Sequence, residues 1–411
     1  MDTLYIGGSV FDGERALGQQ GVLVKDGRIA ELAPAGSFDG FAGRQVDTTG
    51  ATLLPGLIDC HVHLCSGAEA DPGSAQDKLR PGQIVMRALE RAQASLAGGV
   101  IALRDCGGKD HLEFAVRDAV NQGTVAGPTI RAVGRMICMT GGHGNRIGRV
   151  ADGADEVVKA VREQIHAGAD WIKIMATGGV MTPGVNPEDA HYTAEEMAAG
   201  VKEAKRFHRK TASHAQGAEG ILNAVRAGVS SIEHGIFMTE GCVQEMLAKD
   251  VYLVPTLAAV MNILRHKDQG IAPYVVEKSE RAYARHRQAV TMFYKAGGKI
   301  AMGTDAGTPF NRHGENAREL QYMVEVGLTP VDSIKAATAN AADLLDLDDR
   351  GRVAKGNRAD LLVVDGDPTR DILKVADKAN HRAVIKDGVL YQAGDRALPA
   401  IAGRIGRLAA E

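Results

Sequence analysis

Apolar and polar positions alternate in blocks along the middle of the chain, from about Leu54 to Asp349. Short apolar runs, each long enough for one buried strand, are separated by stretches with helical spacing, such as Ala154–Ala167 and Thr193–His208. This alternation is typical of parallel βα units. We predict eight strands in this region: Leu54–Leu64, Gly99–Cys106, Thr129–Ile137, Trp171–Ala176, Thr211–Ala215, Ser230–His234, Val251–Leu257 and Lys299–Thr304.

Eight βα units over roughly 300 residues favour an α/β fold of the (β/α)8 TIM barrel type. A doubly wound open sheet is the alternative arrangement of such units. No Gly-x-Gly-x-x-Gly follows the first predicted strand, which weakens that alternative.

The two ends of the chain have a different pattern, with short apolar runs broken by turn dipeptides. Val22–Ala30 and Ala383–Leu390 each read as a hairpin around an Asp-Gly turn. Neither end alone has enough strands for a stable sheet, so we expect both ends to form one small β-sandwich domain. We predict that residues 1–54 and 351–411 together make this β-sandwich, and that residues 55–350 make the barrel.

Composition changes this picture little and excludes several functions. The chain has 411 residues, 45% of them hydrophobic, and a net charge of −3, which argues against binding nucleic acid. No apolar run is long enough to span a membrane, and the N-terminus does not resemble a signal peptide. The five cysteines lack Cys-x-x-Cys spacing and fit reduced thiols, so we expect a cytoplasmic protein.

His61 and His63 follow the first predicted strand at positions i and i+2. Side chains with this spacing point to the same face of a strand, so the two imidazoles can bind one metal ion. A pair of histidines that are merely hydrogen-bonded at a strand end is the simpler alternative for this feature alone.

Four more residues with metal-binding side chains lie where other predicted strands end: Lys173, His214, His234 and Asp305. The carboxyl ends of barrel strands converge on one mouth, where barrel active sites are built. Each of these residues alone is more often structural. Together with His61 and His63 they make six residues at the ends of predicted strands, and this shared position predicts a common site.

These residues resemble the amidohydrolase superfamily, through Pro55–His63, Lys173, His214, Ser231–Gly235 and Gly303–Asp305. The resemblance covers nearly the whole chain. It implies that His61, His63, Lys173 and Asp305 hold one divalent metal, and that Lys173, His214 and His234 hold a second.

The resemblance also implies chemistry for two of these residues. A lysine ammonium has no acceptor and cannot bind a cation, so Lys173 would be carbamylated by CO2 to give a bridging carboxylate. Asp305 would take the proton of the attacking water and deliver it to the leaving amine. Imidazole and carboxylate ligands suit Zn²⁺, with Mn²⁺ or Co²⁺ as substitutes.

A second resemblance narrows the substrate. Leu103–Gly108, Met139–Gly144 and Thr177–Gly179 look like the Xaa-Pro dipeptidase (prolidase) and metal-dependent carboxypeptidase branch. It implies a small-molecule or dipeptide substrate, namely a dipeptide or an N-acyl amino acid. It also implies that the protein is a homo-oligomer. His143 would then be a catalytic residue that hydrogen-bonds the substrate carbonyl, and Tyr192 or Arg104 would bind the substrate, with Arg135 a further candidate for its carboxylate.

Three rival functions remain open from the sequence. A cyclic-amide hydrolase of the dihydroorotase or hydantoinase type would share the metals and the carbamate. A mononuclear deaminase of the imidazolonepropionase type would need one metal and no bridging lysine, so Lys173 argues against it. A non-enzymatic binding protein on this fold would be expected to have lost some of the six ligands.

Overall fold

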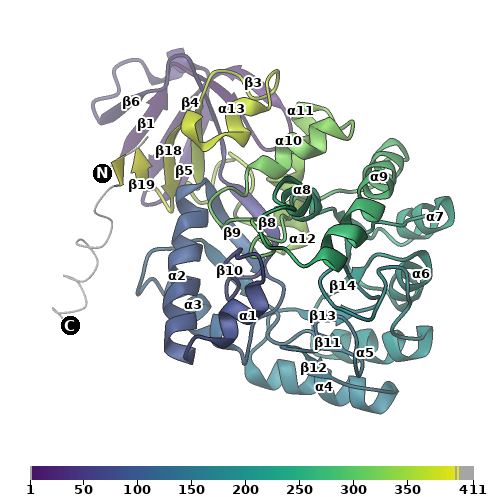
Figure 1. The fold of residues 1–411 in the computed structure, drawn as a ribbon. Coiled ribbons are helices and arrows are strands. Elements are labelled where there is room, and N and C mark those ends of the chain that lie inside the picture. The colour runs from purple at the N-terminus through teal and green to yellow at the C-terminus, as the bar shows by residue number, and fades with distance from the viewer. Residues whose placement is uncertain (1, 394–395, 398–411) are drawn as a thin grey trace.

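A computed structural model of the chain describes residues 2–393 and 396–397. The last residues of the predicted C-terminal segment, 398–411, lie outside this range. Figure 1 shows the first and last strands, in purple and yellow, gathered on one side of the molecule, and the helices and strands of the middle of the chain filling the other.

Strands from both ends of the chain share one sheet. In its order β20-β19-β18-β17-β7-β2-β3, β17 pairs antiparallel with β7, with Leu362 opposite Leu54. A second sheet has the order β5-β4-β1-β6, and apolar side chains of both sheets, including Val22, Leu53 and Ile385, form one buried cluster. The strands of the two sheets are β1 Thr3–Ile6, β2 Ser9–Phe11, β3 Ala16–Gln19, β4 Gly21–Lys25, β5 Arg28–Ala33, β6 Arg44–Asp47, β7 Ala51–Pro55, β17 Leu361–Asp365, β18 His381–Lys386, β19 Val389–Ala393 and β20 Arg396–Ala397.

Both predicted hairpins are present. Lys25 pairs with Arg28, and Lys386 pairs with Val389. The residues between them, Asp26-Gly27 and Asp387-Gly388, all have positive φ. This backbone geometry matches the twist of the flanking strands in two-residue hairpins, and aspartate followed by glycine adopts it most readily.

The middle of the chain alternates parallel strands with helices, so the protein has an α/β fold. One sheet has the order β10-β9-β8 and another the order β12-β11-β13-β14-β15-β16. The strands are β8 Leu57–Val62, β9 Val100–Asp105, β10 Thr129–Ala132, β11 Ile137–Cys138, β12 Arg149–Val150, β13 Ile172–Met175, β14 Thr211–Ala215, β15 Ser231–His234 and β16 Tyr252–Val254.

Two predicted strands are each divided in the structure. Leu54–Leu64 contains the end of β7, which belongs to the end sheet, and β8. They are separated at Gly56, where a Cβ would collide with the side chain of Ile101. Thr129–Ile137 contains β10, which pairs with β9, and the start of β11, which pairs with β13. Gly134, with φ +75°, lies between these two strands.

The eighth predicted strand, 299–304, is an extended segment and not a regular strand. Among the described residues, the only β-bridge of this segment joins Ile300 to Leu253. Even so, the N–H of Ala301 donates to Leu253 of β16 at 3.0 Å, and the N–H of Cys60 in β8 donates to Met302 at 2.8 Å. The segment therefore lies between β16 and β8 and brings Asp305 to the end of β8.

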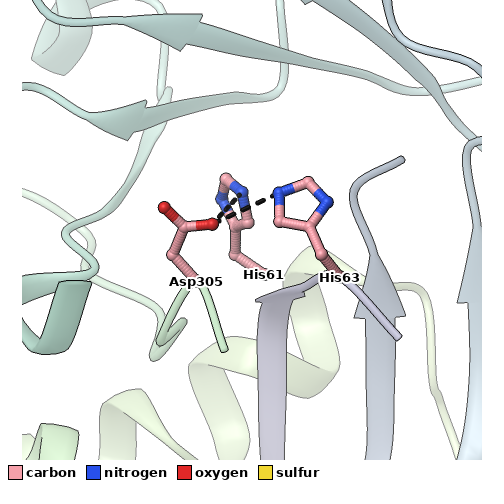
Figure 2. A group of neighbouring side chains, drawn as sticks. All are labelled: His61, His63 and Asp305. Carbon is pink, nitrogen blue, oxygen red and sulfur yellow. Dashed lines mark ion pairs between the residues drawn. The ribbon is translucent and has the colours of Figure 1, made fainter. Parts of the chain in front are cut away.

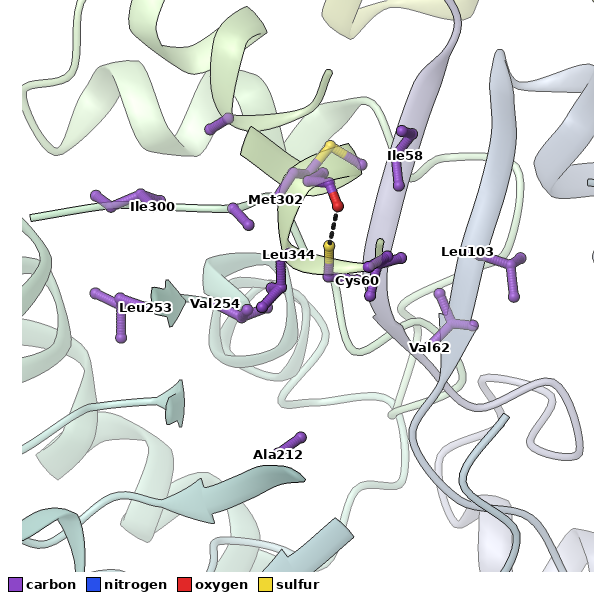
Figure 3. Close-up of a cluster of buried hydrophobic side chains, with 14 of the residues drawn as sticks. Ile58, Cys60, Val62, Leu103, Ala212, Leu253, Val254, Ile300, Met302 and Leu344 are labelled. Atoms are coloured by element: carbon purple, nitrogen blue, oxygen red, sulfur yellow. Dashed lines mark hydrogen bonds between the residues drawn. The ribbon is translucent and has the colours of Figure 1, made fainter. Parts of the chain in front are cut away.

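Side chains on the two faces of β8 have different surroundings. Ile58 and Cys60, two residues apart, are fully buried among apolar side chains from β9, from segment 299–304 and from helix α12 (Ala339–Leu344), including Leu103, Met302 and Leu344 (Figure 3). Successive residues of a strand point to opposite faces, so Asp59 and His61 point away from this cluster. The apolar face anchors the strand, and the other face carries polar side chains.

The helices follow the strands as the sequence pattern predicts. Ala154–Ala167 is α4, and the predicted Thr193–His208 contains α5, with Thr193 as its N-cap in a capping box with Glu196. No helix among the residues that the structure describes has the length and apolarity needed to cross a bilayer. The helices are α1 Pro72–Asp77, α2 Pro81–Ala97, α3 Leu112–Asn121, α4 Ala154–Ala167, α5 Ala194–Arg206, α6 Ala218–Ala227, α7 Glu240–Ala248, α8 Leu257–Arg265, α9 Pro273–Lys295, α10 Arg318–Glu325, α11 Pro330–Ala336, α12 Ala339–Leu344 and α13 Leu373–Ala376.

Candidate metal centre and active site

One cavity of about 240 Å³ lies where the parallel strands end. All six predicted metal ligands line it, although they come from positions spread over most of the middle of the chain. They are His61, His63, Lys173, His214, His234 and Asp305.

Three of these residues converge closely enough to bind one cation. Figure 2 shows the imidazoles of His61 and His63 facing the carboxylate of Asp305. Nε2 of His63 lies 3.2 Å from Oδ1 of Asp305, and Nε2 of His61 lies 3.6 Å from the same oxygen. Two imidazole nitrogens and one carboxylate oxygen therefore point to a common centre.

The other ring nitrogen of each of these histidines is held by the protein. Nδ1 of His61 donates to Oε2 of Glu233 at 2.7 Å, and Nδ1 of His63 donates to the carbonyl of Gly107 at 2.8 Å. These bonds fix the tautomer, leaving Nε2 with a lone pair directed at the centre. Glu233 also accepts from Arg104 and from the Ser231 hydroxyl, so its carboxylate is occupied away from the cavity.

His214 and His234 bring two more imidazoles to the same cavity. The ring centroids of His214 and His234 are 4.6 Å apart, and His234 lies 5.1 Å from His61. Nε2 of His214 donates to the carbonyl of Gly178, and Nδ1 of His234 is bound to the Thr256 hydroxyl. One nitrogen of each ring is left for a ligand in the cavity.

The backbone at two of these positions has an unfavourable conformation. His234 has φ +72° and Asp305 has φ +58°, and Thr256, which holds His234, has φ +54°. Residues with a Cβ rarely adopt this left-handed region, and a β-branched residue does so least often. Such strain persists where the surrounding structure fixes it and clusters at functional sites.

The protonation of the histidines suits cation binding. The pKa values of His61, His214 and His234 lie well below the ordinary value, mainly because the three rings are buried. The positive charge of Lys173 lowers all three further. Burial opposes protonation of His63 too, but the carboxylate of Asp305 beside its ring raises the pKa of His63. Three neutral imidazoles are in the form that coordinates a metal.

Lys173 is the unusual member of the group. Its side chain is 2% exposed, in β13, and its charge depresses the pKa values of the surrounding histidines. No residue in 2–393 or 396–397 forms a hydrogen bond or ion pair with its amine. A buried ammonium without a partner is strongly unfavourable, so the protonated form of the lysine does not fit these surroundings.

A buried acid connects the two segments that carry His61 and Asp305. Asp59 accepts hydrogen bonds from the Thr304 hydroxyl at 2.6 Å, from the Asn316 amide at 2.7 Å and from the N–H of His61. Burial raises the pKa of Asp59 to about 6 in spite of these donors. Asp59 therefore holds the end of β8 against the segment that leads into Asp305.

His143 lies beside the histidine group. It lines the cavity, and its ring centroid is 4.5 Å from that of His214. Nδ1 of His143 is bound to the Thr182 hydroxyl at 2.8 Å, and a Cβ on Gly179 would collide with the ring. Burial lowers the pKa of His143 to about 3, so its imidazole is neutral.

The expected substrate contacts of Arg104 and Tyr192 do not agree with their positions, because neither residue lines the cavity. Arg104 is fully buried and donates to Glu233, Ser231 and the carbonyl of Cys60. The hydroxyl of Tyr192 donates to the carbonyl of Ala151 at 2.7 Å. Arg135 likewise donates to two backbone carbonyls, those of Ile147 and Gly148.

Three residues of the site were not predicted from the sequence. Glu233 precedes His234 in a buried strand, and a charged residue there is the signal that could have revealed it. Arg146 lines the cavity mouth, next to the glycine-rich Gly141–Gly144. His286 lies within α9 and lines the cavity, and its Nε2 has no partner among the described residues, a position without any signal in the sequence.

The chain is similar in sequence and structure to known proteins. The sequence model of the amidohydrolase family matches residues 52–391. The ochratoxinase of Aspergillus niger is 32% identical over 380 residues, which covers 83% of this chain and 75% of that protein.

Two solved structures are similar over nearly the whole chain. A Xaa-Pro dipeptidase with methionine bound in its active site is 33% identical, with a TM-score of 0.88 over 96% of this chain and all of the other. A prolidase in complex with N-methylphosphonate-L-proline is 32% identical, with a TM-score of 0.87 and the same coverage. The chain therefore belongs to the amidohydrolase family and is a hydrolase that acts on amide C–N bonds.

Proposed function

We propose that this protein is a binuclear metal-dependent amidohydrolase that cleaves a dipeptide or an N-acyl amino acid and releases an amino acid. One observation carries the binuclear assignment: Lys173 is buried among imidazoles without a partner for its amine among the described residues. An ammonium is unfavourable in these surroundings, whereas an anion between two cations would be stabilised there.

We infer that the eight parallel segments close into a (β/α)8 barrel, with a β-sandwich domain made from both chain ends. The hydrogen bonds of segment 299–305 to β16 and β8 support closure on one side. The pairing of β10 with β9 and of β11 with β13 supports it on the other. The domains would be residues 1–54 and 351–411 for the sandwich and 55–350 for the barrel.

The residues present fit two divalent metals once Lys173 is carbamylated. The neutral amine adds to CO2 and loses one proton, which gives a carbamate with two oxygens and one negative charge. This anion removes the unfavourable buried ammonium and can serve both halves of the site, with His61, His63 and Asp305 on one side and His214 and His234 on the other. Imidazole and carboxylate ligands favour Zn²⁺, with Mn²⁺ or Co²⁺ as substitutes.

Bound metals would supply Lewis acidity, which polarises the amide carbonyl and makes water nucleophilic at neutral pH. Asp305 takes the proton of the attacking water on its carboxylate and delivers it to the nitrogen of the leaving amine. The proposed role of His143 requires the tautomer in which Nδ1 accepts from the Thr182 hydroxyl and the proton of the neutral ring is on Nε2. That N–H donates to the carbonyl oxygen as negative charge develops there.

The similar proteins support an amino acid as the leaving group. The dipeptidase was solved with methionine in its active site, and the prolidase with a proline derivative that carries a tetrahedral phosphonate. Both ligands contain an amino acid carboxylate. The cavity of this chain also has an apolar wall, including Ile236, Val260 and Ile263, which suits an apolar side chain or acyl group.

Metal and CO2 dependence test the binuclear assignment. The protein is stripped with a chelator and reconstituted with Zn²⁺ in buffers with and without bicarbonate. We expect two equivalents of zinc per chain and a requirement for bicarbonate, with Lys173→Met binding less metal under either condition. A single equivalent without any effect of bicarbonate would overturn the assignment and favour a mononuclear deaminase.

A substrate screen tests the rest of the proposal. Dipeptides and N-acyl amino acids are compared with cyclic ureides and lactams, with release of a free amino acid as the readout. Turnover of the linear amides alone supports the proposal. Turnover confined to the cyclic amides would replace it with a hydrolase of the dihydroorotase or hydantoinase type.

A further inference from the structure

The wall of the active-site cavity carries one arginine, Arg146, among many apolar side chains. Elements that follow β8 and β11 contribute Pro72, Gly73 and Arg146 to the lining. Residues that follow β15 and β16 contribute apolar side chains, among them Ile236 and Val260. In the sheet order β12-β11-β13-β14-β15-β16, strand β11 is separated from β15 and β16 by two or more strands, so Arg146 comes from a different part of the wall than Ile236 and Val260. The wall near Arg146 also contains the apolar side chains of Met136 and Ile147.

Arg146 is the cation at the cavity mouth. Of the lysine and arginine side chains in residues 2–393 and 396–397, only those of Arg146 and Lys173 line the cavity. Lys173 is the residue that would bridge the metals, which leaves Arg146 to meet an anionic substrate group. Its side chain is 46% exposed, as expected at a mouth that admits a ligand from solvent.

The guanidinium of Arg146 is held in place but keeps donors free. Nη2 of Arg146 is paired with Asp77 at the end of α1. Nη1 lies against Gly73, where a Cβ would collide with it, so glycine at this position lets the guanidinium lie against the backbone of α1. Asp71 also lines the cavity and accepts hydrogen bonds from the N–H and hydroxyl of Ser74. These bonds, and to a smaller extent the charge of Arg146, lower the pKa of Asp71. A guanidinium has five N–H donors, and the pair with Asp77 does not use all of them.

We propose that Arg146 binds the carboxylate of the amino acid that is released, so that the substrate lies across the cavity with this carboxylate at the mouth near α1. This inference rests on the proposed function, because it assumes an N-acyl amino acid or dipeptide. It replaces Arg104 and Tyr192, which do not line the cavity. Arginine is suited to this role because its planar fork matches the two oxygens of a carboxylate.

The test compares two probes that differ in one group. N-acetyl-L-methionine has the carboxylate, and N-acetyl-L-methioninamide has a neutral amide in its place. The ratio of their kcat/KM values is measured for the zinc-loaded wild-type protein and for Arg146→Met. We expect the ratio to favour the acid in the wild type and to fall by about 10- to 100-fold in the variant, mainly through KM, because a charge-assisted hydrogen bond to bound substrate is lost.

Two further variants separate this role from a structural one. Lys109→Met removes a cation that pairs with the same Asp77 but does not line the cavity, and it should leave the ratio unchanged. Asp77→Asn breaks the ion pair while keeping Arg146, so it should preserve or increase the preference for the acid. A ratio unaffected by Arg146→Met, or lowered equally by Lys109→Met or Asp77→Asn, would overturn the inference.

Binding of both probes to the wild type and to Arg146→Met, measured by calorimetry, keeps the test independent of turnover. If the protein hydrolyses no N-acyl amino acid or dipeptide, the proposed function is contradicted. The subsite would still be supported if the acid binds more strongly than the amide and this difference depends on Arg146. Hydrolysis without any dependence on Arg146 would support the function and reject the subsite. Equal binding of acid and amide to the wild type would also reject it.

Discussion

Glu233 and His61 form the hydrogen bond that orients the candidate metal centre. Oε2 of Glu233 lies 2.7 Å from Nδ1 of His61, and both side chains are almost fully buried. On its other oxygen, Glu233 accepts from Arg104 at 2.7 Å, and the guanidinium of Arg104 lies over the Trp171 ring. His61 is therefore held at Nδ1 by a carboxylate that is itself fixed by a buried arginine.

Glu233→Gln should weaken metal binding. The amide cannot accept from Nδ1 of His61 with the strength of a carboxylate, and partners of this kind typically contribute about 10- to 100-fold in metal affinity. Zinc affinity measured by competition with a chromogenic chelator tests this expectation. Glu325→Gln, at a position away from the cavity, is the control. Thermal unfolding of the metal-free proteins shows whether the variant still folds, since Arg104 loses its buried partner.

Asp305→Asn should remove the group that moves the proton while keeping the fold. Asparagine tolerates the positive φ of this position, so we expect a folded protein whose kcat falls by about 10²–10⁴-fold, the usual contribution of a general acid–base. Asp110→Asn is a matched control, because Asp110 also has positive φ and is exposed. A kcat near the wild-type value in Asp305→Asn would reject the assignment.

His143→Asn should reduce kcat by about 10²–10³-fold if the Nε2 of His143 donates to the developing oxyanion. Thr182→Val should cause a smaller loss, because it removes only the hydroxyl that holds Nδ1. Steady-state kinetics of both variants with the same N-acyl amino acid give the comparison. Equal kcat values for His143→Asn and the wild type would exclude this role.

Glu319 should make the protein less stable as the pH rises. This acid on α10 accepts from the N–H groups of Leu257 and Ala258 at the start of α8, and burial raises its pKa from 4.5 to about 8. Between pH 4.5 and about pH 8, Glu319 is deprotonated in the unfolded chain but keeps its proton in the folded protein. The stabilisation is therefore complete below pH 4.5 and is lost as the pH rises through about 8, with a slope of up to about 1.4 kcal/mol per pH unit.

Urea unfolding at several pH values between about 5 and 8.5 measures this slope. Glu319→Gln should flatten it, although the variant will be less stable at each pH because one N–H of α8 loses its acceptor. Glu325→Gln, on the same helix but outside its buried face, should keep the wild-type slope. Equal slopes for wild type and Glu319→Gln would contradict the expectation.

Tertiary structure changed the interpretation of individual residues more than that of the strands. Arg104 and Arg146 both lie at the ends of predicted strands or in the loops beyond them, and the sequence does not distinguish them. In the structure, Arg104 points into the packed interior and meets Glu233, whereas Arg146 reaches the cavity. The direction of a long side chain depends on its neighbours in space, and these come from distant regions of the chain.

The sequence alone determined the alternation of strands and helices, both Asp-Gly hairpins and the six side chains that line one cavity. These features follow from local rules: strand and helix periodicity, turn geometry, and the position of a residue at the carboxyl end of a strand. Three further features depend on packing between distant parts of the chain: Glu233 holds His61, Asp59 joins β8 to the segment before Asp305, and Lys173 lacks a partner among the described residues. These are contacts between residues as far apart as Asp59 and Thr304, 245 positions along the chain, and their burial sets the charge that each group can carry.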